Sequence, residues 1–100
     1  MATKNLQFVP GYYEWHLTDK NGNVLHNMTD PSDSLFGENG EPLNYDEITD
    51  LCASDLLSAE FYYADGKEYN GVFNENGWTA KEIQAASLVM ATALYNYYFA

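Results

Sequence analysis

The sequence contains no arginine and only four lysines, against fifteen aspartates and glutamates in 100 residues. The formal net charge is therefore −11 when both histidines are neutral. Proteins bind DNA and RNA largely through Lys and Arg side chains that neutralise phosphates and release counterions. A chain with this charge would be repelled by nucleic acid, so direct nucleic-acid binding is excluded.

Cysteines and long apolar runs are also scarce. Cys52 is the single cysteine, so no internal disulfide can form. The first residues lack the basic segment and apolar run of a secretory signal. The most apolar stretch, 85–100, is interrupted by polar side chains and is shorter than the roughly 18 residues that cross a bilayer. We therefore expect a cytoplasmic protein that makes no contact with membranes.

Apolar residues are nevertheless abundant enough for a core. They make up 46% of the chain, and aromatic residues make up 16%. A globule of this length buries roughly 65% of the surface that its unfolded chain exposes. No boundary divides the sequence, so we expect one folded domain over 1–100.

Strand-forming runs flank an Asn-Gly pair near the start of the chain. YYEWHL and NVLHNM lie on either side of Asn21-Gly22, which is typical of a hairpin over 12–28. A two-residue turn there places six residues on one nearly apolar face, namely Tyr13, Trp15, Leu17, Val24, His26 and Met28. A second hairpin is predicted over 59–73, where a three-residue loop at Asp65-Gly66-Lys67 segregates the aromatic side chains onto one face.

Two capping-box patterns predict the starts of two helices. Asn44 and Glu47 form the first box, and Thr79 and Glu82 form the second. The patterns predict helices over 45–57 and 80–98. The first carries an apolar stripe of Ile48, Leu51, Cys52 and Leu56, and the second carries a wider apolar arc of Ile83, Ala86, Met90, Leu94 and Tyr97.

The order hairpin, helix, hairpin, helix predicts an α+β fold. We expect an antiparallel sheet of about four strands with two helices on one face, in the order ββαββα. The stretch 29–43 reads as an irregular acidic loop, long for a connector within a compact domain, and is therefore either mobile or functional.

Negative charge is concentrated in the middle of the chain. The 46 residues between Lys20 and Lys67 contain ten acids and no lysine or arginine. Asp46 and Asp50 stand one helical turn apart with Glu47 beside them, and such a row, continued by the acidic loop, resembles the phosphates of a nucleic-acid strand. It would suit a basic cleft. The candidate partner-binding residues are Asp30, Asp33, Phe36, Glu38, Glu41, Asp46, Glu47, Asp50 and Asp55.

The charge and the aromatic residues do not require a basic partner. An acidic surface can serve only to keep a protein soluble. The aromatic cluster Tyr97-Tyr98-Phe99 at the end of the second helix favours core packing or a homodimer through that helix. Solubility and dimerisation therefore both stay open as roles for these residues.

Neither a metal site nor a catalytic group is expected. The segment from Asp19 to Asp30 spaces its oxygens as in an EF-hand, but Val24 stands where that loop needs glycine. Cys52 lies on the apolar stripe of the first helix, where a structural thiol is expected, and His26 lies on the inner face of the hairpin. The pattern therefore indicates no enzyme activity and no cofactor.

In its size, its pI near 4.1 and its two hairpins, the chain resembles the small acidic proteins that phages and mobile elements encode against host defences, anti-CRISPR proteins above all. The segments GKEYNGVF and WTAKEIQAASLVMATAL also resemble the C-terminal region of ArdB-type antirestriction proteins. These resemblances imply a protein that occludes the cationic surface on which a defence nuclease holds DNA or guide RNA.

The leading hypothesis is therefore an inhibitor in the host cytoplasm. Its partner would be a host nuclease or CRISPR effector with a basic surface, met by acidic side chains that stand in for phosphates. The alternative is a dimeric adaptor or regulatory protein that binds its partners through aromatic surfaces.

Overall fold

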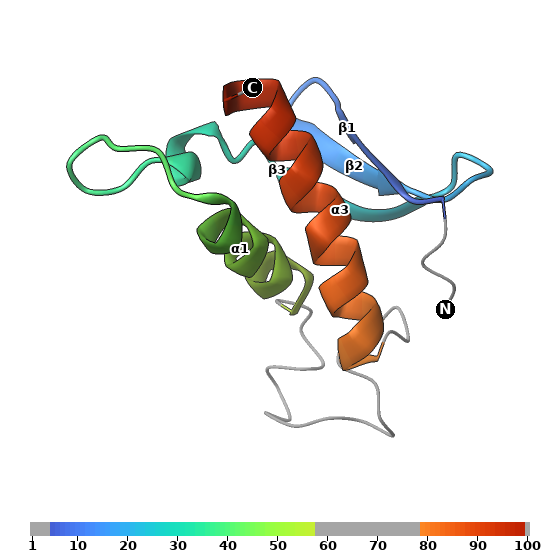
Figure 1. The fold of residues 1–100 in the computed structure, drawn as a ribbon. Helices are drawn as coiled ribbons and strands as arrows, with labels where there is room; N and C mark the ends of the chain where they lie inside the picture. Colours follow the sequence, from blue (N-terminus) through green and yellow to red (C-terminus); the bar gives the residue numbers. More distant parts are fainter. Residues whose placement is uncertain (1–4, 58–78, 100) are drawn as a thin grey trace.

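The computed structural model describes residues 5–57 and 79–99, which are coloured in Figure 1. Their elements are β1 (Gln7–Pro10), β2 (Glu14–Thr18), β3 (Val24–Thr29), the 3₁₀ helix η1 (Ser32–Leu35), α1 (Tyr45–Leu57) and α3 (Ala80–Phe99). Over these two ranges the fold is α+β, with a three-stranded antiparallel sheet in the order β1-β2-β3 and two α-helices. α3 crosses one face of the sheet and packs against β1, and α1 packs beside α3 (Figure 1).

The strand β1 is absent from the prediction. It pairs with β2, placing Phe8 opposite Leu17. It is short and ends at Pro10, which cannot donate a ladder hydrogen bond, so it suits a sheet edge and leaves little trace in the sequence pattern. Three strands thus precede α1 where two were expected, and the order ββαββα is not confirmed. The hairpin predicted over 59–73 lies outside the described residues.

The pairing of β2 with β3 follows the predicted register over most of its length. Trp15 lies opposite Met28, and Leu17 lies opposite His26. Trp15, Leu17 and Met28 are buried, as the alternating pattern predicts. The apolar face of this hairpin therefore forms the sheet side of the core.

The turn between β2 and β3 differs from the prediction. The Asp19 N–H donates to the Asn23 carbonyl at 3.0 Å and Gly22 has a φ of 81°, so the loop holds three residues rather than two. A bulge beside Thr18 then restores the register. It pairs Thr18 with Val24, so Val24 turns outward with 53% of its surface exposed instead of joining the apolar face.

Both helices begin at their predicted capping boxes. The Glu47 N–H donates to Asn44 Oδ1 at 2.8 Å, and the Asn44 N–H donates to Glu47 Oε1 at 3.0 Å. Thr79 and Glu82 make the equivalent pair of bonds at 3.3 and 3.1 Å. α1 has the predicted bounds, and α3 runs one residue further, to Phe99. Neither helix, within the described residues, is both long and apolar enough to cross a membrane.

The core lies between the sheet and the helices. Its buried side chains are Phe8, Trp15, Leu17, Met28, Leu35, Ile48, Cys52, Leu56, Ile83, Ala86, Met90, Ala91 and Leu94. Tyr13 and Tyr97, both predicted for the core face, are instead 76% and 62% exposed. Tyr13 precedes β2 and Tyr97 lies in the last turn of α3, so both extend past the packed layers.

The stretch 29–43 is more regular than predicted. Thr29 belongs to β3, and η1 buries Leu35 completely. Phe36 then forms an isolated antiparallel bridge with Pro42, and the Leu43 N–H donates to the Leu35 carbonyl at 2.8 Å. The segment 36–42, which we call the arm, is thus a closed turn anchored in the core.

Candidate partner-binding surface

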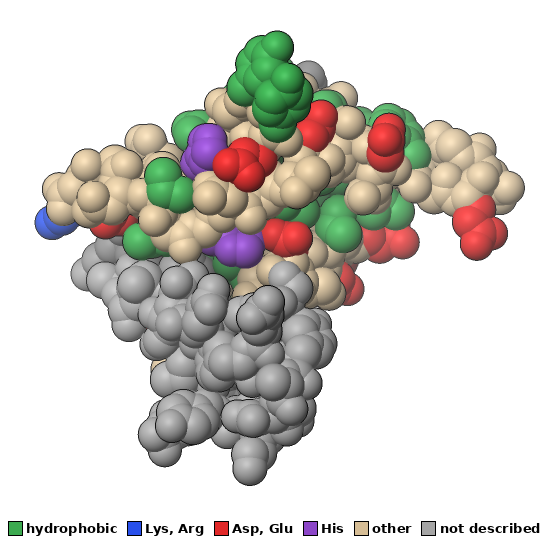
Figure 2. All heavy atoms as spheres, turned by 180° about the vertical axis from the view of Figure 1, so that it is seen from behind, with side chains coloured by type: hydrophobic (Ala, Val, Ile, Leu, Met, Phe, Trp, Pro, Cys, Tyr) green, Lys and Arg blue, Asp and Glu red, His purple; other side chains and the backbone are tan. Residues whose placement is uncertain are grey.

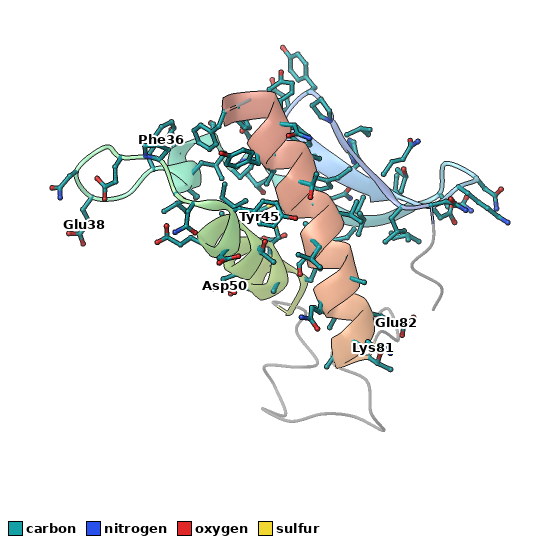
Figure 3. All side chains as sticks on the ribbon, viewed as in Figure 1. Phe36, Glu38, Tyr45, Asp50, Lys81 and Glu82 are labelled. Carbon is teal, nitrogen blue, oxygen red and sulfur yellow. The ribbon has the colours of Figure 1, made fainter. Side chains whose placement is uncertain are left out.

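Six of the predicted acids gather at one end of the molecule, on η1, the arm and the first turns of α1. We call this surface the acidic end, and its acids are Asp33, Glu38, Glu41, Asp46, Glu47 and Asp50. All six side chains are exposed. Figure 3 shows Glu38 at the tip of the arm and Asp50 on the outer side of α1.

No positive side chain balances the acidic end within residues 5–57 and 79–99. The two lysines of these ranges lie elsewhere, Lys20 in the β2–β3 turn and Lys81 at the start of α3. None of the six acids is paired there with a lysine or histidine. Figure 2 shows the acidic side chains of this face as separate patches with polar and apolar atoms between them, and one of them lies beside the lysine. The acidic end therefore presents discrete negative charges.

The charges on α1 act against one another. Asp46 and Asp50 are one turn apart, and like charges at this spacing destabilise a helix by roughly 0.2–0.5 kcal/mol per pair. Asp46 and Glu47 lie in the first turn, where the helix dipole offsets part of this repulsion. Asp50 lies beyond that turn, so its charge has no such compensation.

Aromatic pairs hold the acidic end against the second half of α3. Phe36 contacts Phe99 edge-on, with ring centroids 5.7 Å apart, and 47% of Phe36 remains exposed. Tyr45 contacts Tyr95 with centroids 6.2 Å apart, and its hydroxyl lies 2.7 Å from Thr92 Oγ1. Figure 3 labels Phe36 and Tyr45 on this boundary. These contacts fix the arm and the start of α1, and with them the backbone that carries the carboxylates.

Asp30 lies apart from the acidic end, in a pocket of about 200 Å³ that we call the tyrosine pocket. Its lining is Pro10, Gly11, Tyr12, Tyr13, Glu14, Trp15, Asp30, Tyr97 and Tyr98. Asp30 Oδ1 accepts hydrogen bonds from the Ser32 N–H at 3.0 Å and from the Tyr98 hydroxyl at 3.3 Å. The sequence contained no local signal for this pocket, because its walls come from three separate segments.

The Tyr98 phenol is held in its protonated form. Burial raises its pKa above the ordinary value of 10.0. A hydrogen bond with the Trp15 side chain lowers the pKa, and the negative charge of Asp30 raises it again. Tyr98 therefore acts as a hydrogen-bond donor that links the end of α3 to Asp30.

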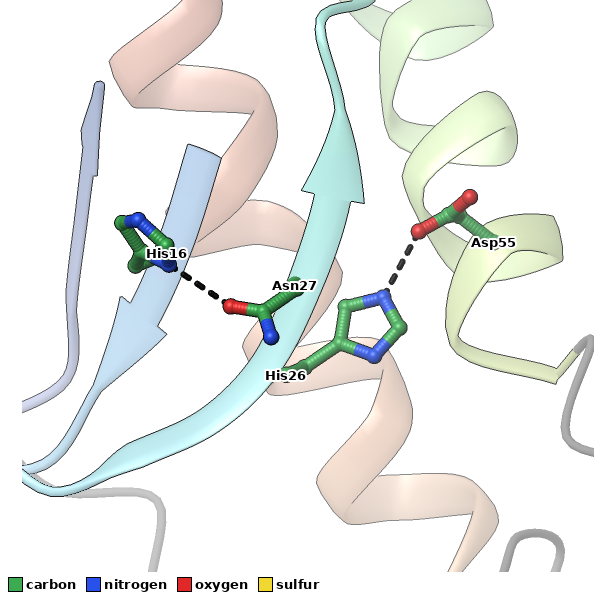
Figure 4. Close-up of polar contacts among 4 residues, drawn as sticks. All are labelled: His16, His26, Asn27 and Asp55. Atoms are coloured by element: carbon green, nitrogen blue, oxygen red, sulfur yellow. Dashed lines mark hydrogen bonds and ion pairs between the residues drawn. The ribbon is translucent and has the colours of Figure 1, made fainter. Parts of the chain in front are cut away.

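Asp55 is the second predicted acid that lies away from the acidic end. Its Oδ2 is 2.6 Å from His26 Nε2, and the two side chains join β3 to α1 (Figure 4). Both are half-buried. His16, on the outer face of the sheet, makes a similar contact of 2.6 Å between its Nδ1 and Asn27 Oδ1 (Figure 4). The prediction that His26 lies on the inner face is confirmed. No sequence pattern indicated that Asp55 would be its partner.

Cys52 lies on the buried stripe of α1, as predicted. Burial, together with the charge of Asp55, raises the pKa of the Cys52 thiol to about 12. At neutral pH the thiol is therefore protonated, which is the opposite of what a nucleophilic cysteine requires. In the part of the chain that the structure describes, no three His, Cys, Asp or Glu side chains form a group that could hold a metal ion.

The structure thus divides the nine predicted residues among three places. The acidic end holds six acids and Phe36, the tyrosine pocket holds Asp30, and the β3–α1 contact holds Asp55. No protein-family model, no curated protein and no solved structure matches this chain.

Proposed function

We propose that this chain is a non-enzymatic inhibitor of a host defence nuclease or CRISPR effector, of the kind that phages encode. It acts in the host cytoplasm by binding the basic surface on which that enzyme holds DNA or guide RNA. Carboxylates of the acidic end take the place of phosphates. The observation that carries the proposal is the acidic end itself, six exposed acids with no lysine or histidine paired to them in the described residues.

The charge of the whole chain supports the same function. A net charge of −11 attracts a cationic protein over a distance of roughly one Debye length, about 8 Å at physiological salt. Such steering raises association rates and is lost as ionic strength rises. The aromatic contacts beneath the acidic end limit the ordering that binding would require, which favours affinity.

A phage plaque assay tests the proposal. The chain is expressed in bacteria that carry one defined CRISPR or restriction system, and a panel of such strains is challenged with a phage that the system targets. We expect the chain to restore plaques on at least one strain. The triple variant Asp46→Asn, Glu47→Gln and Asp50→Asn should restore few or none, because it removes half of the charge of the acidic end while retaining the capping oxygen at position 47.

A second triple variant controls for net charge. Gln7→Lys, Gln84→Lys and Asn96→Lys produce the same change of three charges at exposed positions outside the acidic end. This variant should protect the phage nearly as well as the original chain. If the two variants behave alike, or if the chain restores plaques on no strain, the proposed function is wrong.

The alternative function, a dimeric adaptor, rests on a different observation. An apolar groove of about 400 Å³ lies between the start of the sheet and α3, lined by Leu6, Gln7, Phe8, Leu88, Val89, Thr92 and Ala93. Leu88 is 41% exposed there. Sedimentation at two concentrations distinguishes the two functions: a dimer that Leu88→Ser abolishes favours the adaptor, and a monomer at both concentrations contradicts it.

A further inference from the structure

The tyrosine pocket combines features that the acidic end lacks. Five aromatic side chains line it, Asp30 and Glu14 are among its other residues, and no lysine or histidine is among its walls. Electron-rich aromatic faces attract cations, and carboxylates accept hydrogen bonds from them. The lining therefore favours a positively charged group.

The pocket is built on short, fixed backbone contacts. The Gly11 N–H donates to the Glu14 carbonyl at 2.7 Å, and the Asp30 N–H donates to the Tyr13 carbonyl at 3.2 Å. A side chain at position 11 would lie 2.6 Å from the Glu14 carbonyl oxygen, so the turn requires glycine. The pocket is therefore formed before any ligand arrives.

The aromatic side chains of the pocket also contact one another. Trp15 is buried and meets Tyr97 edge-on, with centroids 5.1 Å apart. Tyr12 and Tyr13 meet edge-on at 4.3 Å, and Tyr97 and Tyr98 meet at 4.9 Å. These edge-on pairs hold the rings of the pocket relative to one another.

One carboxylate oxygen remains for a ligand. Within the described residues, both hydrogen bonds to the Asp30 side chain, from the Ser32 N–H and the Tyr98 hydroxyl, go to Oδ1. Oδ2 of Asp30 is then the acceptor for an incoming cation.

The volume and the lining of the pocket indicate which kind of cation it would bind. A volume of about 200 Å³ is below the roughly 300–1,000 Å³ of pockets that hold whole small molecules, so it suits a single side chain. A guanidinium group is planar, stacks on aromatic faces and carries five donors for surrounding acceptors. An ammonium group has three donors and no plane to stack.

The rim of the pocket indicates that the cation belongs to a protein. Tyr12, Tyr13 and Tyr97 are 89%, 76% and 62% exposed, and a free small ligand inside the pocket would leave them in water. Tyrosine, tryptophan and arginine dominate the binding energy of protein interfaces, where a central anchor is surrounded by aromatic contacts. We propose that the tyrosine pocket receives an arginine side chain from a partner protein, which is held by stacking and by the carboxylate of Asp30.

This proposal stands apart from the acidic end and from the anti-defence function. An NMR titration of the full ¹⁵N-labelled chain tests it. The probe is the peptide acetyl-Leu-Arg-Leu-amide, and the same peptides with lysine or citrulline are the matched probes, since citrulline keeps the shape of arginine without its charge. The Trp15 indole and the amides of 11–14 and 30 should shift with the arginine peptide, less with lysine and least with citrulline.

Two single variants locate the binding. Asp30→Asn keeps an oxygen that can accept from Ser32 and Tyr98, so the fold should persist, but it should weaken the arginine peptide about tenfold because a charge-assisted bond is lost. Asp33→Asn makes the same change of charge three residues away, outside the pocket, and should leave the affinity unchanged. Methylguanidinium, which lacks the flanking groups, should bind more weakly than the peptide.

Three results would overturn the proposal. Shifts confined to the acidic end, or equal losses for Asp30→Asn and Asp33→Asn, would show general attraction to negative charge. Equal affinity for arginine and citrulline would exclude recognition of a cation. Equal affinity for methylguanidinium and the peptide would show a small-molecule site rather than a protein-docking site.

Discussion

The acidic end and the tyrosine pocket both present carboxylates, but they hold them in opposite ways. The six acids of the acidic end stand exposed, and aromatic pairs support only the backbone beneath them. Asp30, although also exposed, is bonded to Ser32 and Tyr98 beside five aromatic rings. The first arrangement suits attraction at a distance, and the second suits recognition on contact. Substitutions that damage one region and spare the other test this difference.

The largest effect is expected at Leu35, which anchors the arm in the core. Leu35→Ala should lower the free energy of unfolding by about 2–5 kcal/mol, because the side chain is completely buried and its loss leaves a cavity. Chemical denaturation measures this change. Val24→Ala, at a position that is 53% exposed, should cost less than about 1 kcal/mol. Equal effects of the two would contradict the placement of Leu35 in the core.

A smaller effect is expected at Gly11, which shapes the tyrosine pocket. Gly11→Ala should cost about 1–3 kcal/mol, since the added carbon would lie too close to the Glu14 carbonyl oxygen and the turn must shift. Thermal or denaturant unfolding measures the loss, and the NMR shifts should stay within the pocket. Asn39→Ala, on the exposed arm, is the control. Shifts that extend over the acidic end would show that the two regions are not separate.

The next largest loss of stability is expected at Asn44, which caps α1. Asn44→Ala should cost about 1 kcal/mol, because Oδ1 of Asn44 accepts the Glu47 N–H at the helix start. Asn44→Asp, which keeps a capping oxygen, should restore most of the stability. The test is denaturant unfolding of both variants together with the helical circular dichroism signal. A loss equally large in both would point to a role for Asn44 other than capping.

The smallest effect is expected at Asp19, in the β2–β3 turn. Its side-chain hydrogen bond with Asn23, and those with the Asn23 and Asn21 amides, hold its pKa below the ordinary value of 3.8. A carboxyl group whose pKa is lowered on folding stabilises the fold above its unfolded pKa, and that contribution is lost as the pH falls through the folded pKa. The protection of the turn amides, measured as exchange rates relative to the intrinsic rate at each pH between pH 6 and pH 3, should therefore fall in acid more in the original chain than in Asp19→Asn. An equal loss of protection in both would show that Asp19 does not control the turn.

Features encoded by neighbouring residues could be predicted from the sequence. Both helices begin at their predicted capping boxes, because a cap depends on residues only three apart. The register of β2 with β3 could also be predicted, since one apolar face fixes it. The type of the β2–β3 turn could not be predicted. Its additional loop residue is compensated by a bulge, so the register of the strands is the same for both turn types.

Features that join distant segments could not be predicted. Tyr98 and Asp30 are 68 positions apart, so only the fold brings them together at the tyrosine pocket. The contact between His26 and Asp55 depends on how α1 lies against β3, which no local pattern fixes. The sequence predicts Asp30 and Asp55 as partner-binding residues because of their charge alone. In the structure they lie away from the acidic end, in contacts that depend on the fold.

The most direct test of the central claim measures whether the chain and DNA compete for one surface. The nuclease complex identified by the plaque assay is loaded with fluorescent DNA, and anisotropy is followed as the chain is added at two salt concentrations. The account predicts that the DNA is displaced, more effectively at low salt, and that the triple variant of Asp46, Glu47 and Asp50 displaces it poorly. A complex that holds the chain and the DNA together would contradict the account.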